Sequence, residues 1–165
     1  MIGRRLLVAG IGNVFFGDDG FGVEVARRLG ARPQPEGVRI ADFGIRGIDL
    51  AYALTDGVDA AILIDAVPRG GAPGTLYVLE PDVRAAPAGT IADTHRLDPS
   101  TVLGLLCTLG DHQPVVRLVG CEPSAGSDDE MMLGLSAPVA AAVDEAVTLV
   151  EALVAELCGS AVGRA

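Results

Sequence analysis

The amino-acid sequence predicts an α/β protein, a three-layer α/β/α sandwich whose five-stranded sheet is mainly parallel with one antiparallel strand. Short apolar runs alternate with helix-type patterns along most of the chain, which favours this class. Half of the 165 residues are hydrophobic, yet only 4% are aromatic and none is Trp. Such a composition suits helices that pack through small aliphatic side chains on a sheet rich in Val, Ile and Leu.

The spacing of apolar residues assigns each element in turn. Phe21, Val25 and Leu29 recur every four residues, as on one face of a helix, and residues 60–64 form the apolar run of a buried strand. Pro99 confines the regular part of the third helix to the residues that follow it. Strands are expected at residues 6–9, 38–41, 60–64, 75–79 and 115–119, and helices at residues 20–30, 47–54, 97–109 and 137–157.

The connection between the third and fourth strands predicts the antiparallel member of the sheet. Residues 68–74 read Pro-Arg-Gly-Gly-Ala-Pro-Gly, which is too short and too rich in turn residues for a helical crossover. The chain shows no internal repeat and no linker. We therefore expect a single domain over residues 1–165, with its core at about residues 5–157.

Charge and cysteine usage narrow the function classes. The formal net charge is −10, and an acidic surface repels phosphate backbones and anionic lipids, so nucleic acid and membranes are poor partners. Cys107, Cys121 and Cys158 are scattered, as in proteins of a reducing compartment. No apolar stretch approaches the roughly 20 residues that span a bilayer. We expect a cytoplasmic monomer.

The segment GIGNVFFGDDGFG, residues 10–22, joins the first strand to its helix. Gly10 and Gly12 match the start of a dinucleotide fingerprint, but Phe15 occupies the third glycine position. Asp18 and Asp19 stand at the start of the helix, where a pyrophosphate requires amide groups and positive charge. The segment thus argues against nucleotide binding. One acid could cap the helix while the other faces a cleft, and chemistry alone weighs these roles evenly.

Asp65 and His95 are the other candidate site residues. Asp65 directly follows a buried apolar strand, where a carboxylate must be paired, hydrogen-bonded or bound to a cation. If the first and third strands are neighbours, Asp65 and Asp19 open onto one crevice. The only other histidine, His112, precedes a strand, which suits the opposite edge of the sheet. A lone loop histidine is more often a surface residue, so spacing alone supports His95 weakly.

Two carboxylates and one imidazole together suit a divalent transition ion such as zinc or nickel, with positions left open for water or substrate. The proposed ligands are Asp19, Asp65 and His95, which contain no thiolate and so differ from a closed structural zinc site. Ser124, Ser127 and Ser136 have no histidine motif nearby, and no cysteine lies beside a histidine, so no nucleophilic mechanism is indicated.

Several motifs, in order, resemble the hydrogenase maturation endopeptidase family. They are GIGN with the following DDGFG, then DFG and IRG, ILIDAV, APGT, THRL, VG-x-EP and GLS, and they cover residues 5–157. The resemblance implies a three-layer fold with one antiparallel strand, and a metal held by Asp19, Asp65 and His95. It also matches Asp42 to an Asp of an Asp-Gly-Gly-type motif that is thought to assist cleavage.

Three features depart from the family pattern, and one of them is that Ala137 stands between the GLS motif and Pro138, where the usual order is Gly-Leu-Ser-Pro. Asp19 stands where Glu is frequent, so a metal must sit closer to the backbone. Phe43 stands where Gly is frequent, and we expect its ring to narrow the cleft.

The resemblance implies an endopeptidase that removes a short C-terminal extension from the nickel-loaded precursor of a hydrogenase large subunit. The nickel would belong to the substrate, and zinc or a similar ion could replace it in vitro. In one route the metal activates the attacking water. In the other it serves only recognition, and Asp18 or Asp42 positions the water. A different metal-dependent peptidase and a non-catalytic nickel-binding chaperone remain as alternatives.

Overall fold

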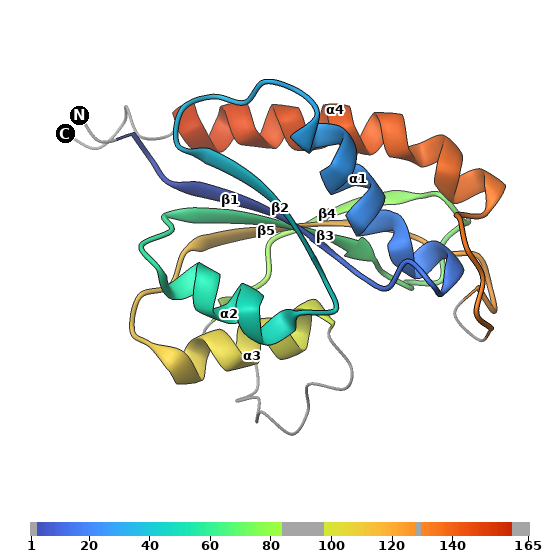
Figure 1. Cartoon of the computed structure of the whole chain (residues 1–165), viewed down its shortest axis with the longest axis horizontal. Coiled ribbons are helices and arrows are strands. Elements are labelled where there is room, and N and C mark those ends of the chain that lie inside the picture. The colour runs from blue at the N-terminus through green and yellow to red at the C-terminus, as the bar shows by residue number, and fades with distance from the viewer. Residues whose placement is uncertain (1–2, 84–97, 128–129, 160–165) are drawn as a thin grey trace.

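A computed structural model of the chain describes residues 3–83, 98–127 and 130–159 (Figure 1). Its strands are β1 (Leu6–Ile11), β2 (Val38–Gly44), β3 (Ala60–Ala66), β4 (Leu76–Leu79) and β5 (Val115–Cys121). Its helices are α1 (Phe21–Gly30), α2 (Gly47–Thr55), α3 (Pro99–Leu109) and α4 (Ala137–Gly159), with a short 3-10 helix, η1 (Gly17–Gly20), before α1. The predicted alternation of strands and helices is confirmed.

The five strands form one sheet in the order β2-β1-β3-β5-β4. The pairs β1–β2, β1–β3 and β3–β5 are parallel, and β4 runs antiparallel to β5. The expected antiparallel strand and the expected contact between the first and third strands are thus both present. Because β1, β2, β3 and β5 are parallel, their carboxyl ends meet at one edge of the sheet.

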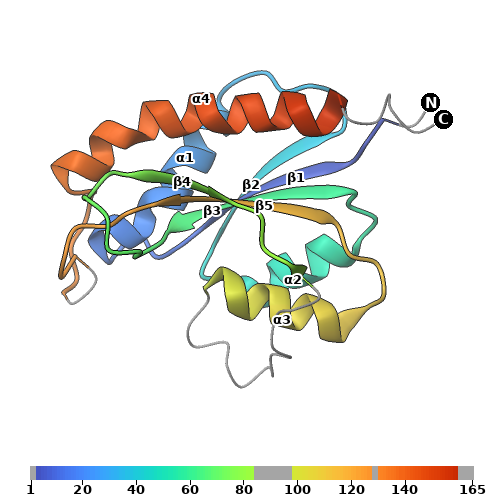
Figure 2. The same cartoon turned by 180° about the vertical axis from the view of Figure 1, so that it is seen from behind.

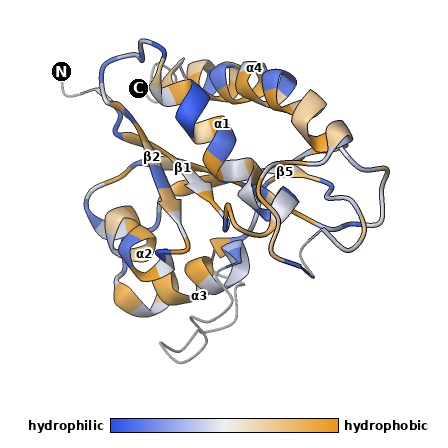
Figure 3. Ribbon diagram, turned by 45° about the vertical axis from the view of Figure 1, so that its right-hand side comes forward, coloured by the Kyte–Doolittle hydropathy of each residue, from blue (hydrophilic) through white to orange (hydrophobic). Residues whose placement is uncertain are grey.

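The helices cover both faces of this sheet, as Figures 1 and 2 show from opposite sides. Leu6 and Val8 of β1 pack with α1 and α4 on one face, while Leu7 and Ala9 pack with α2 and α3 on the other. Adjacent strand residues point to opposite faces, so a strand buried on both sides must be apolar throughout. Figure 3 shows hydrophobic colour along the strands and hydrophilic stretches on the outside of α1.

A close approach of glycine backbones sets α1 on the sheet. A Cβ atom added to Gly22 would lie 2.0 Å from the Ile64 carbonyl oxygen and 2.5 Å from that of Ile11. A Cβ atom on Gly10 would lie 2.4 Å from the Gly22 carbonyl oxygen. Close helix–strand packing is therefore supplied by Gly10 and Gly22, and Phe15 is free to lie in the loop between β1 and η1.

The structure also tests three smaller predictions, on the start of α3, the position of Phe43 and membrane-spanning helices. The regular helix α3 begins at Pro99 itself, and the expected start at Leu97 lies outside the described part. Phe43 does not narrow a cleft: it is buried in the core on the α2 and α3 face, with the Arg46 guanidinium 5.6 Å from its ring centre. Within the described residues, no helix has the length and apolar character needed to cross a bilayer.

Candidate functional site

The candidate site lies at the carboxyl edge of the parallel strands. Asp19 follows β1 within η1, Asp42 lies near the end of β2, and Asp65 lies near the end of β3. Since β1 lies between β2 and β3, three acidic residues from separate parts of the chain approach one edge. Open α/β sheets bind their ligands at this edge.

The turn after β1 holds Asp19 through its backbone. Gly12 has φ +131°, and a Cβ atom on it would lie 1.8 Å from the Asp19 carbonyl oxygen and 3.5 Å from Asp65 Oδ1. Only glycine fits this position. The backbone N–H of Asn13 donates to Asp19 Oδ2 at 2.8 Å. The Asp19 carboxylate is only partly buried and so remains accessible at the edge.

Asp65 is a buried carboxylate beside this turn. It is 5% exposed, and its Oδ1 accepts a hydrogen bond from the N–H of Ala66 at 2.8 Å. Burial is the main reason that the pKa of Asp65 lies well above its ordinary value, and the charge of Asp19 raises it further. The two acids therefore share one electrostatic environment, as the strand order predicted. A cation between them would offset both effects.

The start of α3 lies near Asp65 as well. Asp98 caps the helix by accepting the Thr101 N–H at 2.8 Å, and its charge contributes to the raised pKa of Asp65. His95, the third predicted ligand, lies outside the described residues. Among the residues that are described, no three His, Cys, Asp or Glu side chains form a metal-binding group. His112 lies at the opposite edge, as expected, with Nε2 2.7 Å from the Val58 carbonyl oxygen.

Asp18 has different surroundings from those of its neighbour Asp19. It is completely buried, and its carboxylate accepts hydrogen bonds from the Ser124 N–H at 2.9 Å, the Ser136 N–H at 2.7 Å and the Ser136 hydroxyl at 2.9 Å. It thereby joins η1 to the segment between β5 and α4. Neither Asp18 nor Asp19 caps α1 with its side chain. This burial favours a structural role for Asp18 over the positioning of water.

Asp42 lies on the outer strand β2, opposite Gly10 of β1. Asp42 is exposed, and its backbone carbonyl accepts a hydrogen bond from Arg46 Nη2 at 2.6 Å. The carboxylate can thus meet solvent or a substrate at the edge of the sheet. The structure leaves its catalytic role as a prediction.

Glu122 lies beside the candidate site. It belongs to the VG-x-EP motif, but the sequence did not lead us to predict a functional role for it. Its carboxylate accepts the N–H groups of Arg69 at 2.7 Å and Gly70 at 3.0 Å, and the Tyr77 hydroxyl at 2.9 Å. The Arg69 N–H is the foremost cause of its lowered pKa. Glu122 fixes the loop between β3 and β4. Its position directly after the apolar strand β5 could have indicated this role, just as the position of Asp65 at the end of β3 did.

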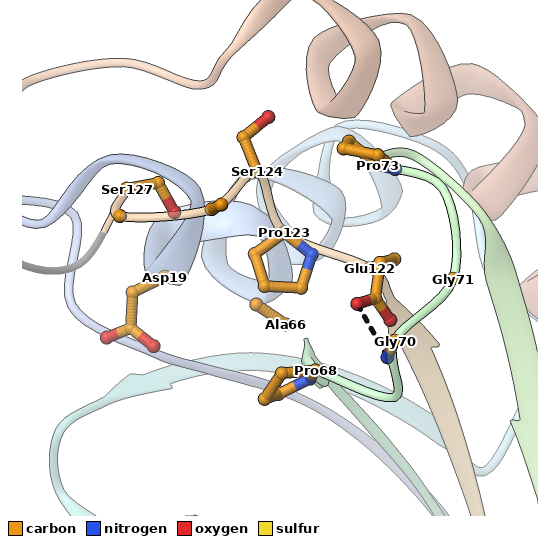
Figure 4. A pocket seen from close by; sticks show the side chains of 12 residues that line it. Asp19, Ala66, Pro68, Gly70, Gly71, Pro73, Glu122, Pro123, Ser124 and Ser127 are labelled. Carbon is orange, nitrogen blue, oxygen red and sulfur yellow. Dashed lines mark hydrogen bonds between the residues drawn. The ribbon is translucent and has the colours of Figure 1, made fainter.

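A pocket of about 420 Å³ lies between this loop and the segment after β5. Asp19 lies at its margin, with Ala66, Glu122 and Ser124 also lining it (Figure 4). Apart from the acids, the walls are Pro, Gly, Ala and Ser residues, which leave backbone groups within reach of a ligand.

The fold and the edge define a class: an α/β protein whose acidic side chains gather where parallel sheets bind their ligands. Residues 23–153 match the family model of the hydrogenase maturation proteases. The protein HupM of Azotobacter chroococcum mcd 1, a hydrogenase expression/formation protein, is 35% identical over 92% of this chain and 72% of its own. The chain belongs to the hydrogenase maturation protease family.

Further relatives agree with this assignment. The hydrogenase 2 maturation protease of Escherichia coli K12 is 31% identical over 97% of this chain and 96% of its own. The solved structure of the hydrogenase maturating endopeptidase HybD from E. coli is similar with a TM-score of 0.74, at 30% identity over 93% of both chains. A hydrogenase 2 maturation peptidase from a thaumarchaeote reaches a TM-score of 0.66 at 33% identity, over 91% of this chain and 98% of its own. The protein is accordingly an endopeptidase.

Proposed function

We propose that this endopeptidase removes a short C-terminal extension from the nickel-loaded precursor of a [NiFe]-hydrogenase large subunit. The observation that carries the proposal is the pair of carboxylates, Asp19 and Asp65, held together at the carboxyl edge of a protein of this family. The pocket beside Asp19 offers room for the segment that is cut.

In this proposal Asp19, Asp65 and His95 recognise the nickel that the precursor carries, and another divalent ion such as zinc can take its place in vitro. Asp19 and Asp65 supply hard oxygen ligands and His95 an imidazole nitrogen, a set suited to such ions. Asp98, three residues after His95 in the chain, lies close enough to Asp65 to raise its pKa. Because His95 is three residues from Asp98 in the chain, their Cα atoms are at most about 11 Å apart, which supports a common site for His95 and Asp65.

Two routes to cleavage follow from this arrangement. A divalent ion supplies Lewis-acid polarisation of the scissile carbonyl. Alternatively the ion serves recognition alone, and a carboxylate positions the attacking water. Asp42 is the exposed carboxylate suited to the second role, whereas Asp18 is committed to three hydrogen bonds. Asp42→Asn distinguishes the routes, since it slows trimming only where Asp42 positions water.

The test mixes the purified protein with the nickel-loaded precursor and follows the mass of the precursor. We expect a decrease that corresponds to a C-terminal peptide. Asp19→Ala and His95→Ala should slow trimming by at least about 100-fold, because even residues that support metal ligands contribute about 10–100-fold. Asp56→Ala is the control, since Asp56 is exposed at the end of α2 near the opposite edge.

The outcomes separate the alternatives. Binding of the precursor without a change in its mass favours a chaperone role. Trimming of unrelated peptides at the same rate favours a general peptidase. Normal trimming by His95→Ala would remove His95 from the ligand set.

A further inference from the structure

Four large apolar side chains lie exposed beside the candidate site. Met131, Met132 and Leu133, which precede α4, are 76%, 48% and 74% exposed, and Phe15 in the loop after β1 is 54% exposed. We call these four residues the apolar patch. Single exposed apolar residues are common on soluble proteins, whereas neighbouring ones mark interaction sites.

Backbone hydrogen bonds join the two segments of the apolar patch. The N–H of Met132 donates to the Phe15 carbonyl at 2.8 Å, and the N–H of Gly17 donates to the Met132 carbonyl at 2.7 Å. Phe16 and Met132 form a parallel β-bridge. The apolar side chains are therefore presented by a bonded backbone, which fixes their positions relative to one another.

The same loop links the apolar patch to Asp19. The N–H of Asp19 donates to the Phe16 carbonyl at 3.1 Å, and the Asn13 N–H donates to the Asp19 carboxylate. Only three residues lie between Phe15 and Asp19 in the chain. A body that binds the apolar patch is thus brought directly beside the candidate site.

A groove continues the apolar surface on its other side. It has a volume of about 510 Å³ and is lined by Val14, Leu133, Leu135 and Val143, together with Arg27 and other residues of α1. Leu133 belongs to both the groove and the apolar patch. A partner can therefore lay an apolar surface on the patch and insert one side chain into the groove, as in the centre of a protein interface.

Charge indicates which partner fits. The chain carries a net charge of −10, and the exposed Glu130 directly precedes the apolar patch. A second copy of this chain would bring the same negative charge and would cover Asp19. The groove contains Arg27 and Arg28, and Arg28 pairs with Glu24 and Asp144. The complementary partner therefore has an apolar centre with a basic side chain opposite Glu130.

We propose that the apolar patch and its groove dock the folded body of the substrate, the hydrogenase large-subunit precursor, while its C-terminal segment enters the pocket beside Asp19. This docking surface rests on the proposed function for the identity of the partner. It implies that affinity for the folded precursor depends on residues that do not touch the scissile bond.

The experiment measures binding of the enzyme to immobilised, nickel-loaded precursor by biolayer interferometry, and the mass of the recovered precursor reports trimming. Leu133→Ser should weaken binding at least about tenfold, because a central apolar anchor dominates an interface. Leu109→Ser is the matched control, since Leu109 is 37% exposed at the end of α3, at the opposite edge of the sheet. Circular dichroism and melting temperature verify that both variants are folded.

The outcomes distinguish the two proposals. Weaker binding by Leu133→Ser with normal binding by Leu109→Ser supports the docking surface. Wild-type binding without trimming contradicts the proposed function and leaves the docking surface standing. Normal binding by Leu133→Ser, or no binding by the wild type, overturns the docking surface. A wild-type dimer in size-exclusion chromatography with light scattering that Leu133→Ser dissociates would assign the patch to self-association and overturn it as well.

Discussion

At the scale of single residues, two buried carboxylates serve this protein differently because their donors differ. Asp18 accepts three hydrogen bonds, from Ser124 and Ser136, which compensate for its burial. Asp65 accepts the Ala66 N–H and lies under the charge of Asp19. The hydrogen bonds of Asp18 stabilise the fold, whereas the raised pKa of Asp65 makes it a candidate functional group.

Asp65→Asn should make the metal-free protein more stable near neutral pH. The folded-state pKa of Asp65 is raised, so its contribution to stability is fully present below the unfolded value and is lost as pH rises through the folded value. Asn carries no charge and avoids that loss. We therefore expect a higher free energy of unfolding for Asp65→Asn than for the wild type at about pH 7.5.

Urea denaturation with a chelator present, at about pH 4.5, 6 and 7.5, measures this effect. The advantage of Asp65→Asn should shrink towards the acidic end. A variant that is less stable than the wild type at about pH 7.5 would contradict the assignment of Asp65 as a destabilised carboxylate. The same variant should lose trimming activity, since a neutral amide is a weaker ligand.

Asp18→Ala should destabilise the protein by about 3 kcal/mol, because it leaves the N–H groups of Ser124 and Ser136 buried without their acceptor. Ser124→Ala is the control. It removes the bond between the hydroxyls of Ser124 and Ser136 and keeps the carboxylate, so about 1 kcal/mol is expected. Denaturant midpoints measure both, and equal midpoints for Asp18→Ala and wild type would refute the structural role.

At the scale of elements, the contact of α1 with β1 and β3 decides where Asp19 lies. Helix and sheet meet through Gly10 and Gly22, with no room for a side chain at either position. Because only Gly20 lies between Asp19 and the start of α1, the depth of this contact sets the distance of Asp19 from Asp65. Glu122 similarly holds the loop between β3 and β4 through hydrogen bonds, and this loop forms the other wall of the pocket.

Gly22→Ala should therefore cost about 3 kcal/mol of stability, since its Cβ would lie 2.0 Å from the Ile64 carbonyl oxygen and α1 would have to move. Gly30→Ala tests the same helix without this contact. A Cβ atom on Gly30 meets nothing within 4 Å, so the greater helix propensity of Ala should leave stability unchanged or raise it by up to about 1 kcal/mol. Thermal denaturation of both variants checks the pair, and equal losses would show that the close approach is unimportant.

At the scale of the whole molecule, one sheet separates two apolar cores. One core lies against α1 and α4 and the other against α2 and α3. The central strands β1 and β3 contribute residues to both cores, whereas β4 lies at the sheet margin and is only partly buried. Cooperative loss of both cores is needed to expose the central strands.

Amide hydrogen exchange followed by mass spectrometry should accordingly be slowest in peptides from β1 and β3. Exchange in β4 should be faster by about 100-fold or more, since edge strands open in local fluctuations that leave the cores intact. Similar rates in β3 and β4 would indicate that the sheet opens only as one unit.

Apolar periodicity and turn residues are local properties of the chain, so the order of elements and the mainly parallel sheet could be predicted from the sequence. Strand-end acids likewise made Asp19 and Asp65 candidates, and the family motifs added His95 and Asp42. The folded chain was needed to show that Asp18 is buried and accepts three hydrogen bonds while the adjacent Asp19 lies at the edge of the sheet, and that Phe43 lies in the core. The hydrogen bonds of Glu122 to the loop between β3 and β4, and the apolar patch, also appear only in the structure, since each depends on contacts between segments far apart in the chain. Such contacts leave no periodic trace in sequence, and the folded backbone alone brings them together.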